Sequence, residues 1–104
     1  MNFHKYHAVP TIVDGVRFAS KAEARRYGVL KMMQMAGEIS GLELQPKFPL
    51  VVNGEKICFY VADFRYVKDG QQITEDVKGM RTAVYRIKAK LLKALHGIVV
   101  TETT

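Results

Sequence analysis

The sequence lacks the features that mark secreted and membrane-spanning proteins. Its 104 residues include one cysteine, Cys58, so no disulfide framework can form within the chain. No apolar run approaches the length of a membrane span, and the first residues lack the hydrophobic segment of a signal peptide. Internal repeats and low-complexity stretches are also missing. We therefore expect a cytoplasmic protein that forms a single domain over residues 1–104 and has no membrane partner.

Negative charge is also scarce. Aspartate and glutamate number 10 against 16 lysine and arginine residues, which gives a net charge of +6 at pH 7. A small basic domain commonly binds a polyanion, and nucleic acid is the commonest one. The excess of positive charge is concentrated in two segments that we expect to be helical. These residues are Lys21, Arg25, Arg26 and Lys31 in the first segment, and Arg81, Arg86, Lys88, Lys90 and Lys93 in the second.

The second of these segments, residues 81–96, contains no acid at all. Lysine and arginine on helices that flank a reactive site would hold the phosphates of a nucleic acid. These side chains would contact the phosphate backbone and recognise the shape of the nucleic acid rather than its sequence, since no segment resembles a major-groove recognition helix. The alternative is that these residues form a solvated helix face.

Turn dipeptides and cap residues divide the chain into short elements. Residues 1–10 lack a regular pattern and predict a flexible arm, which makes His4 and His7 poor candidates for a zinc site. The remaining elements follow from turn and cap signals. They are strands at 11–13 and 16–18, a helix from Ser20 to Gly37, an extended piece at 42–45, strands at 48–52, 56–67 and 72–78, a helix at 81–96, and a strand at 98–101.

The order of the main elements predicts an α/β fold. An apolar stripe on the helix at 81–96 is expected to face the core. The strand at 98–101 follows that helix and should join the sheet parallel to its neighbour. The pattern is αβββαβ, a mixed sheet flanked by helices. The residues of the apolar stripe are Val84, Ile87, Leu91 and Leu95.

Two acids are expected to face each other across the second hairpin. If Asp69-Gly70 is a two-residue turn, Asp63 falls directly opposite Asp76, with the side chains on one face. Lys78 projects from that face as well. Paired carboxylates repel each other, and a divalent cation such as Mg²⁺ would offset the repulsion. A lysine beside them can orient water or neutralise charge on a phosphate, as phosphodiester hydrolysis requires.

Other interpretations of this hairpin remain open. A longer turn or a bulge would move Asp76 away from Asp63. An Asp-x-Lys pattern on a strand also arises from simple solvated alternation. Glu75 shares a face with the apolar Ile73 and Val77, so it lies at the end of the sheet or is the metal ligand in place of Asp76.

Four segments together resemble a known superfamily. They are Phe18–Tyr27 (FASKAEARRY), Gln45-Pro46, Tyr60–Phe64 (YVADF) and Glu75–Gly79 (EDVKG). In order and spacing the chain resembles the PD-(D/E)xK nucleases, and more closely a group of small phage endonucleases and Holliday-junction-resolvase-like proteins. The resemblance runs from about residue 18 to residue 97. It implies a restriction-endonuclease-like core with the same αβββαβ order.

The resemblance also implies roles for individual residues. Asp63 matches the first motif acid, although Ala62 stands in place of the proline, and Asp76 and Lys78 match the second acid and the lysine. Glu23 matches the acid that many junction-resolving members place on the first helix to complete the metal site. The capping-box spacing from Ser20 is a competing explanation for Glu23, and the two roles do not exclude each other.

The activity that follows from the resemblance is Mg²⁺- or Mn²⁺-dependent hydrolysis of DNA. Tyr85, Arg86 and Lys88 lie where related nucleases often place DNA-contacting residues. Our leading hypothesis is a structure-selective endonuclease of phage or prophage origin that acts, as a homodimer, on branched DNA such as Holliday junctions. The alternatives are a nicking or restriction-like duplex endonuclease and a non-catalytic DNA-binding phage protein on a nuclease scaffold.

Overall fold

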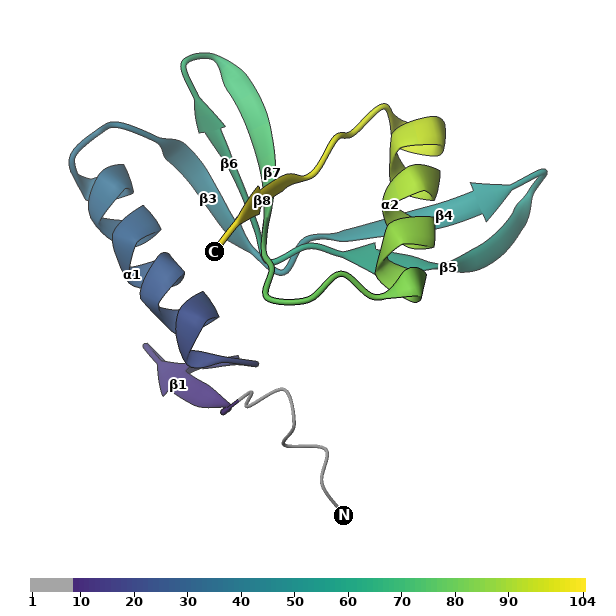
Figure 1. Cartoon of the computed structure of the whole chain (residues 1–104). Helices are drawn as coiled ribbons and strands as arrows, with labels where there is room; N and C mark the ends of the chain where they lie inside the picture. Colours follow the sequence, from purple (N-terminus) through teal and green to yellow (C-terminus); the bar gives the residue numbers. More distant parts are fainter. Residues whose placement is uncertain (1–8) are drawn as a thin grey trace.

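The computed structural model describes residues 9–104 (Figure 1). The predicted arm, with His4 and His7, lies almost entirely outside the described residues. Ten short elements follow one another along residues 9–104, and they confirm an α/β fold with a mixed sheet and two helices in this part of the chain. They are β1 (Thr11–Val13), β2 (Val16–Phe18), α1 (Lys21–Met35), β3 (Ser40–Leu44), β4 (Lys47–Val52), β5 (Glu55–Val61), β6 (Phe64–Lys68), β7 (Gln71–Val77), α2 (Ala83–His96) and β8 (Thr101–Thr103).

The central sheet has the strand order β3-β6-β7-β8. β3, β6 and β7 are antiparallel neighbours, and β8 joins β7 in parallel, as its position after a helix predicts. The predicted strand at 98–101 was wrong in its bounds, because pairing begins only at Thr101. Ile98 and Val100 instead pack against the hydrophobic cluster beneath α2, which holds this segment away from the sheet.

The predicted strand at 56–67 is interrupted at Ala62-Asp63. Its first half, β5, pairs with β4, and its second half, β6, pairs with β3. Hydrogen bonds still join the two segments where β5 ends and β6 begins. The amide of Gln45 donates to the carbonyl of Asp63 (2.9 Å), and the amide of Ala62 donates to the carbonyl of Pro46 (3.1 Å). Gln45 has a left-handed φ of 53°, which turns the chain at this point. The β4-β5 ribbon therefore bends out of the central sheet, with Asp63 at the corner.

Each helix covers a different part of this bent sheet (Figure 1). α1 packs on the central sheet, where Tyr27 and Leu30 meet Phe64 and Tyr66 in one core cluster. α2 lies on the β4-β5 ribbon, and Leu92 is fully buried there. Burial of one such leucine contributes about 1.5–3 kcal/mol to the free energy of folding. Each half of the molecule therefore has its own small hydrophobic core.

The side of α2 that packs overlaps the predicted stripe only at Leu91. Tyr85, Ala89 and Leu92 face the ribbon. In the predicted stripe Val84 is 67% exposed and Ile87 is 60% exposed. The helix also begins later than predicted: Thr82 is the N-cap, and its hydroxyl accepts from the amide of Tyr85. Within residues 9–104, no helix is long and apolar enough to cross a membrane.

Candidate active site

The second hairpin has the predicted register. Asp69 and Gly70 both have positive φ (51° and 75°), as a two-residue type I′ turn requires, and Lys68 pairs with Gln71. The ladder continues to Phe64, which lies opposite Glu75. One step further the sheet reaches its corner, and Asp63 and Asp76 lie next to each other there.

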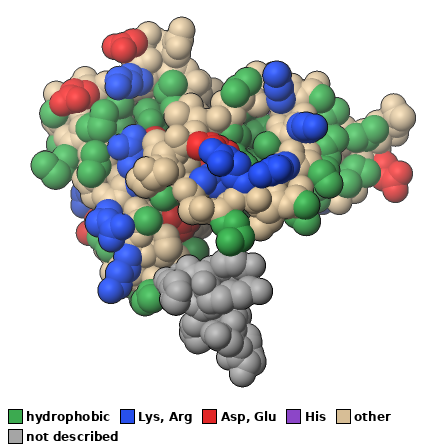
Figure 2. Space-filling model, in the orientation of Figure 1, with side chains coloured by type: hydrophobic (Ala, Val, Ile, Leu, Met, Phe, Trp, Pro, Cys, Tyr) green, Lys and Arg blue, Asp and Glu red, His purple; other side chains and the backbone are tan. Residues whose placement is uncertain are grey.

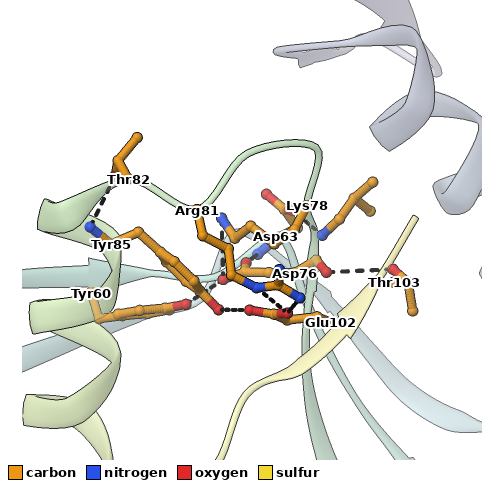
Figure 3. Close-up of polar contacts among 10 residues, drawn as sticks. Tyr60, Asp63, Asp76, Lys78, Arg81, Thr82, Tyr85, Glu102 and Thr103 are labelled. Atoms are coloured by element: carbon orange, nitrogen blue, oxygen red, sulfur yellow. Dashed lines mark hydrogen bonds and ion pairs between the residues drawn. The ribbon is translucent and has the colours of Figure 1, made fainter.

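The two aspartates are linked through main-chain amides (Figure 3). The amide of Asp63 donates to Oδ1 of Asp76 at 2.9 Å, and the amide of Val77 donates to Oδ2 of Asp63 at 2.7 Å. The Tyr60 hydroxyl donates to the other oxygen of Asp76. Asp76 is 2% exposed, so these donors replace the water that it loses on burial.

Asp63 occupies an environment that disfavours its negative charge. Burial is the largest effect and raises the pKa of Asp63 to about 8, although the Val77 amide acts in the opposite direction. The carboxylates of Glu23 and Asp76 raise the pKa further. The three acids therefore influence one another at the corner of the sheet.

Glu23 reaches this corner from the first turn of α1. Its amide donates to Oγ of Ser20 at 3.2 Å, and its Oε2 accepts from the amide of Ala19, also at 3.2 Å. The predicted capping interaction is present, with the reciprocal bond made to Ala19 rather than to the cap residue itself. Glu23 thus caps the helix and lies beside Asp63 at the same time.

Lys78 is the cation nearest to Asp76. Its Nζ lies 3.7 Å from Oδ2 of Asp76 and 4.2 Å from the centre of the Tyr85 ring. The amide of Lys78 donates to the carbonyl of Thr103 at 2.8 Å, so β8 fixes the main chain at this point. With 24% of its side chain exposed, the ammonium group can reach solvent.

Glu75 faces the opposite side of the sheet. Its carboxylate is completely buried and accepts two bonds from Arg26 (2.7 and 2.9 Å), one from Tyr66 (2.6 Å) and one from Thr103 (3.2 Å). Burial acts to raise the pKa of Glu75, but the Arg26 and Tyr66 donors outweigh it and the pKa is lowered. Of the two acids left open by the sequence, Asp76 is therefore the one beside Asp63.

Arg26, expected to contact DNA, is instead held by Glu75. A signal for this pair exists in the sequence, because a carboxylate on an apolar strand face needs a buried partner. The other predicted DNA-contacting residues remain at the surface to different degrees. Lys21, Arg25, Arg81 and Arg86 are exposed, while Tyr85 and Lys88 are half-buried.

Tyr60 and Glu102 also lie at the site, although neither was predicted as a site residue. Glu102 lies beside Asp76 in the parallel ladder, where it accepts from Arg81 (2.8 and 2.5 Å) and from the Tyr85 hydroxyl (2.6 Å). Burial and the Glu102 carboxylate raise the pKa of Tyr85 to about 12.

A pocket of about 210 Å³ opens next to these residues. Its lining consists of Tyr60, Val61, Asp76, Lys78, Thr82, Val84, Tyr85 and Lys88.

The donor set favours a hard, strongly hydrated cation. Among residues 9–104, no three carboxylate, imidazole or thiolate groups come close enough together to enclose a metal ion. Asp63 and Asp76 could hold one between them, with Glu23 adjacent. Mg²⁺ commonly binds one or two carboxylates, and water and phosphate oxygens complete its coordination shell.

Comparison with known proteins places the chain in one family. A search of curated proteins found no match. A family model matches residues 3–100, nearly the whole chain, and its description is "Protein of unknown function (DUF1064)". The matched range includes Glu23, Asp63, Asp76 and Lys78. The chain therefore belongs to the DUF1064 family.

Proposed function

We propose that this protein is a metal-dependent DNA endonuclease of the PD-(D/E)xK type, with its core in the restriction-endonuclease-like arrangement. The observation that carries the proposal is the placement of Asp63 and Asp76 side by side at the sheet corner, with Lys78 3.7 Å from Asp76. Mg²⁺ or Mn²⁺ is the proposed cofactor. When bound, it supplies Lewis-acid activation of a phosphate oxygen and of the attacking water.

The protein's own residues have separable tasks in this proposal. Asp63 and Asp76 bind the cation, and Glu23 approaches it from the helix. Tyr60 holds one oxygen of Asp76 and so fixes the orientation of that carboxylate. Lys78 orients the attacking water or neutralises the charge that develops on the phosphate.

The energetic cost of the site supports a functional role. Asp63 lies in a setting that raises its pKa to about 8, mainly through burial. A fold gains nothing from a buried acid beside two others unless a ligand compensates for it. Strongly perturbed acids in a cleft are typical of catalytic and metal-binding sites.

Branched DNA, such as a Holliday junction, is the proposed substrate, and a homodimer the proposed assembly. Several apolar side chains on one side of α2 and on β5 are exposed, a feature typical of protein interfaces. Ile87 is 60% exposed and Ile57 is 55% exposed. A dimer that covered them would present two active sites to two DNA strands. Sedimentation of the Ile87→Asp variant tests this assembly: the wild type should dimerise and the variant should not.

A cleavage assay tests the enzymatic proposal. The wild type, Asp63→Asn, Lys78→Ala and the control Lys68→Ala are incubated with four-way junction, flap, duplex and single-stranded DNA in Mg²⁺, Mn²⁺ or chelator. Lys68 is exposed at the far end of the same hairpin. We expect metal-dependent cutting of the junction by the wild type and Lys68→Ala, and loss of at least 100-fold in the other two variants.

One observation favours a non-catalytic DNA-binding protein as the second candidate. Three metal-ligating side chains do not converge tightly within residues 9–104. DNA binding without cutting under every metal condition would establish that candidate and overturn the enzyme. Preferential cutting of plain duplex would instead identify a nicking or restriction-like endonuclease.

A further inference from the structure

A groove runs beside the acidic site, between α2 and the segment that leads into β8. Its volume is about 480 Å³, within the range of ~300–1,000 Å³ typical of ligand sites. On the side of the molecule seen in Figure 2, blue cationic side chains lie over the region of α2, with green apolar surface next to them. The groove is lined by Arg81, Tyr85, Arg86, Ala89, Lys90, Lys93, Val99, Val100 and Glu102.

The groove combines an apolar floor with a cationic rim. Ala89, Val99 and Val100 supply the apolar surface, and Val99 is 69% exposed. The rim cations Arg86, Lys90 and Lys93 occupy one side of α2, since their spacing follows the helical repeat. In the part of the chain that the structure describes, no carboxylate lies within ion-pair distance of these three.

Among the described residues that line the groove, Glu102 is the single acid, and its charge is already neutralised. Glu102 accepts two bonds from Arg81 and one from the Tyr85 hydroxyl. Its negative charge therefore opposes an incoming anion only weakly. The net charge along the groove remains strongly positive, which suits a ligand that carries several phosphates.

We propose that this groove binds an unpaired DNA strand as it leaves the active site. The apolar floor of the groove favours single-stranded over duplex DNA as the ligand. Duplex DNA presents phosphates and base edges, but the faces of its bases are stacked inside the helix. An unpaired strand exposes those faces, which can lie against Val99 and Val100 while the phosphates meet Lys90 and Lys93.

The groove and the candidate active site share a wall. Tyr85 lines both, and the smaller pocket beside it also contains Asp76 and Lys78. From Tyr85 to Lys93 the helix rises ~12 Å, enough for about three stacked nucleotides. A strand with its scissile phosphate at the acids could thus continue along α2. This inference rests on the proposed nuclease function and specifies its substrate: branched DNA with an unpaired segment beside the cut.

Binding measured in chelator separates the groove from catalysis. Fluorescence anisotropy compares a 12-nucleotide single strand with a blunt duplex of the same length, for the wild type and for Lys90→Ala/Lys93→Ala. The matched control is Lys56→Ala/Lys68→Ala, which removes two exposed lysines from the hairpins. We expect the groove variant to lose at least 10-fold in affinity for the single strand, while duplex affinity and the control change less than 3-fold.

Salt titration tests whether the two lysines contact phosphates. Each lost phosphate contact on a single strand lowers the slope of log K against log salt by about 0.7, so Lys90→Ala/Lys93→Ala should lower it by about 1.4. Val99→Asn should weaken single-strand binding without changing the slope, because it alters the floor and leaves the charge intact. Unchanged single-strand binding in both variants, or an equal loss on duplex, would overturn the groove proposal.

The cleavage assay keeps the two proposals distinguishable. If Lys90→Ala/Lys93→Ala loses single-strand affinity, Asp63→Asn binds the single strand as the wild type does, and no protein cuts any DNA, the groove stands and the nuclease fails. If the wild type cuts junctions while Lys90→Ala/Lys93→Ala binds the single strand normally, the nuclease stands and the groove fails.

Discussion

The main-chain amide of Asp63 donates a 2.9 Å hydrogen bond to Oδ1 of Asp76, so one acid of the pair orients the other. Asp76 is held on its second oxygen by Tyr60, and Asp63 by the amide of Val77. The same amide also donates to the main-chain carbonyl of Glu75 (3.2 Å), so at the bend between β5 and β6 it is shared between β7 and the Asp76 carboxylate. Because the side chains of Asp63 and Tyr60 make different hydrogen bonds from that of Asp76 to the main chain, each of the three residues can be substituted separately.

Asp63→Asn should make the metal-free protein more stable at alkaline pH. Burial raises the pKa of Asp63 from an ordinary value of 3.8 to about 8. A raised carboxyl pKa favours the folded state at low pH, and this contribution is lost as the pH rises through about 8. We expect the variant to gain on the order of 1–3 kcal/mol over the wild type at pH 9 and much less at pH 4.

Thermal unfolding in chelator between pH 4 and pH 9 measures this difference. A gain of 1 kcal/mol corresponds to a Tm increase of roughly 4–8 °C for a domain of this size. Asp69→Asn serves as the control, because Asp69 lies in an exposed turn. A Tm difference for Asp63→Asn that stays constant across this pH range would contradict the prediction.

Mg²⁺ should stabilise the wild type at pH 8 and have a smaller effect on Asp63→Asn and Asp76→Asn. A ligand that binds only the folded state adds about 2.7 kcal/mol at 100 times its Kd. The cation would relieve the repulsion between the paired carboxylates, which the asparagine variants no longer have. Differential scanning fluorimetry with increasing Mg²⁺ measures the shift, with Glu38→Gln as the exposed-acid control. Equal shifts in wild type and both variants would place the ion elsewhere.

Tyr60→Phe should weaken metal binding more than it slows the chemical step. The hydroxyl donates to Asp76 and touches no reacting atom in the proposed mechanism, so Tyr60 is a positioning residue. Loss of such a support commonly costs 10–100-fold in metal affinity. Cleavage rates measured against Mg²⁺ concentration should show a higher half-saturating concentration, with the maximal rate reduced less than 5-fold. Loss of rate that excess Mg²⁺ does not restore would assign Tyr60 a direct role.

The sequence was sufficient to predict features set by local chemistry. Asp69-Gly70 determines a two-residue turn, and the register set by that turn brings Asp63 next to Asp76 at the end of the ladder. The capping signal at Ser20 likewise depends on a few neighbouring residues, since its hydroxyl accepts from the amide of Glu23. Such features are predictable because the interaction partners lie only a few residues apart.

Features that depend on distant partners were not predictable in this way. Nothing in residues 56–67 signals the bend at Ala62-Asp63, which depends on hydrogen bonds to Gln45 and Pro46 in the connection between β3 and β4. The predicted stripe is periodic enough to predict burial, yet Val84 and Ile87 are exposed, and the ribbon packs against Leu92 and the stripe residue Leu91. Helical periodicity identifies an apolar side but does not say which neighbour covers it.

Arg26→Met should strongly destabilise the fold. Arg26 makes two charge-assisted bonds to Glu75, whose carboxylate is completely buried, so the substitution leaves that carboxylate with Tyr66 and Thr103 only. Removing one partner of a buried pair typically costs about 3–5 kcal/mol, a large part of the ~5–15 kcal/mol that stabilises a domain. Urea unfolding at pH 7 measures the loss, and Arg25→Met, at an exposed neighbouring position, should change stability by less than about 0.5 kcal/mol.

The same pair predicts how stability responds to acid. The pKa of Glu75 is lowered below its ordinary value of 4.5, so its contribution is present above that value and is lost as the pH falls below it. The disadvantage of Arg26→Met should therefore shrink as the pH falls below 4.5, because protonation of Glu75 removes the buried charge that Arg26 neutralises. Arg26→Met/Glu75→Leu should be more stable than Arg26→Met at pH 7, because it leaves no buried charge without its partner. A double variant no more stable than the single one would show that shape, rather than charge, makes this pair necessary.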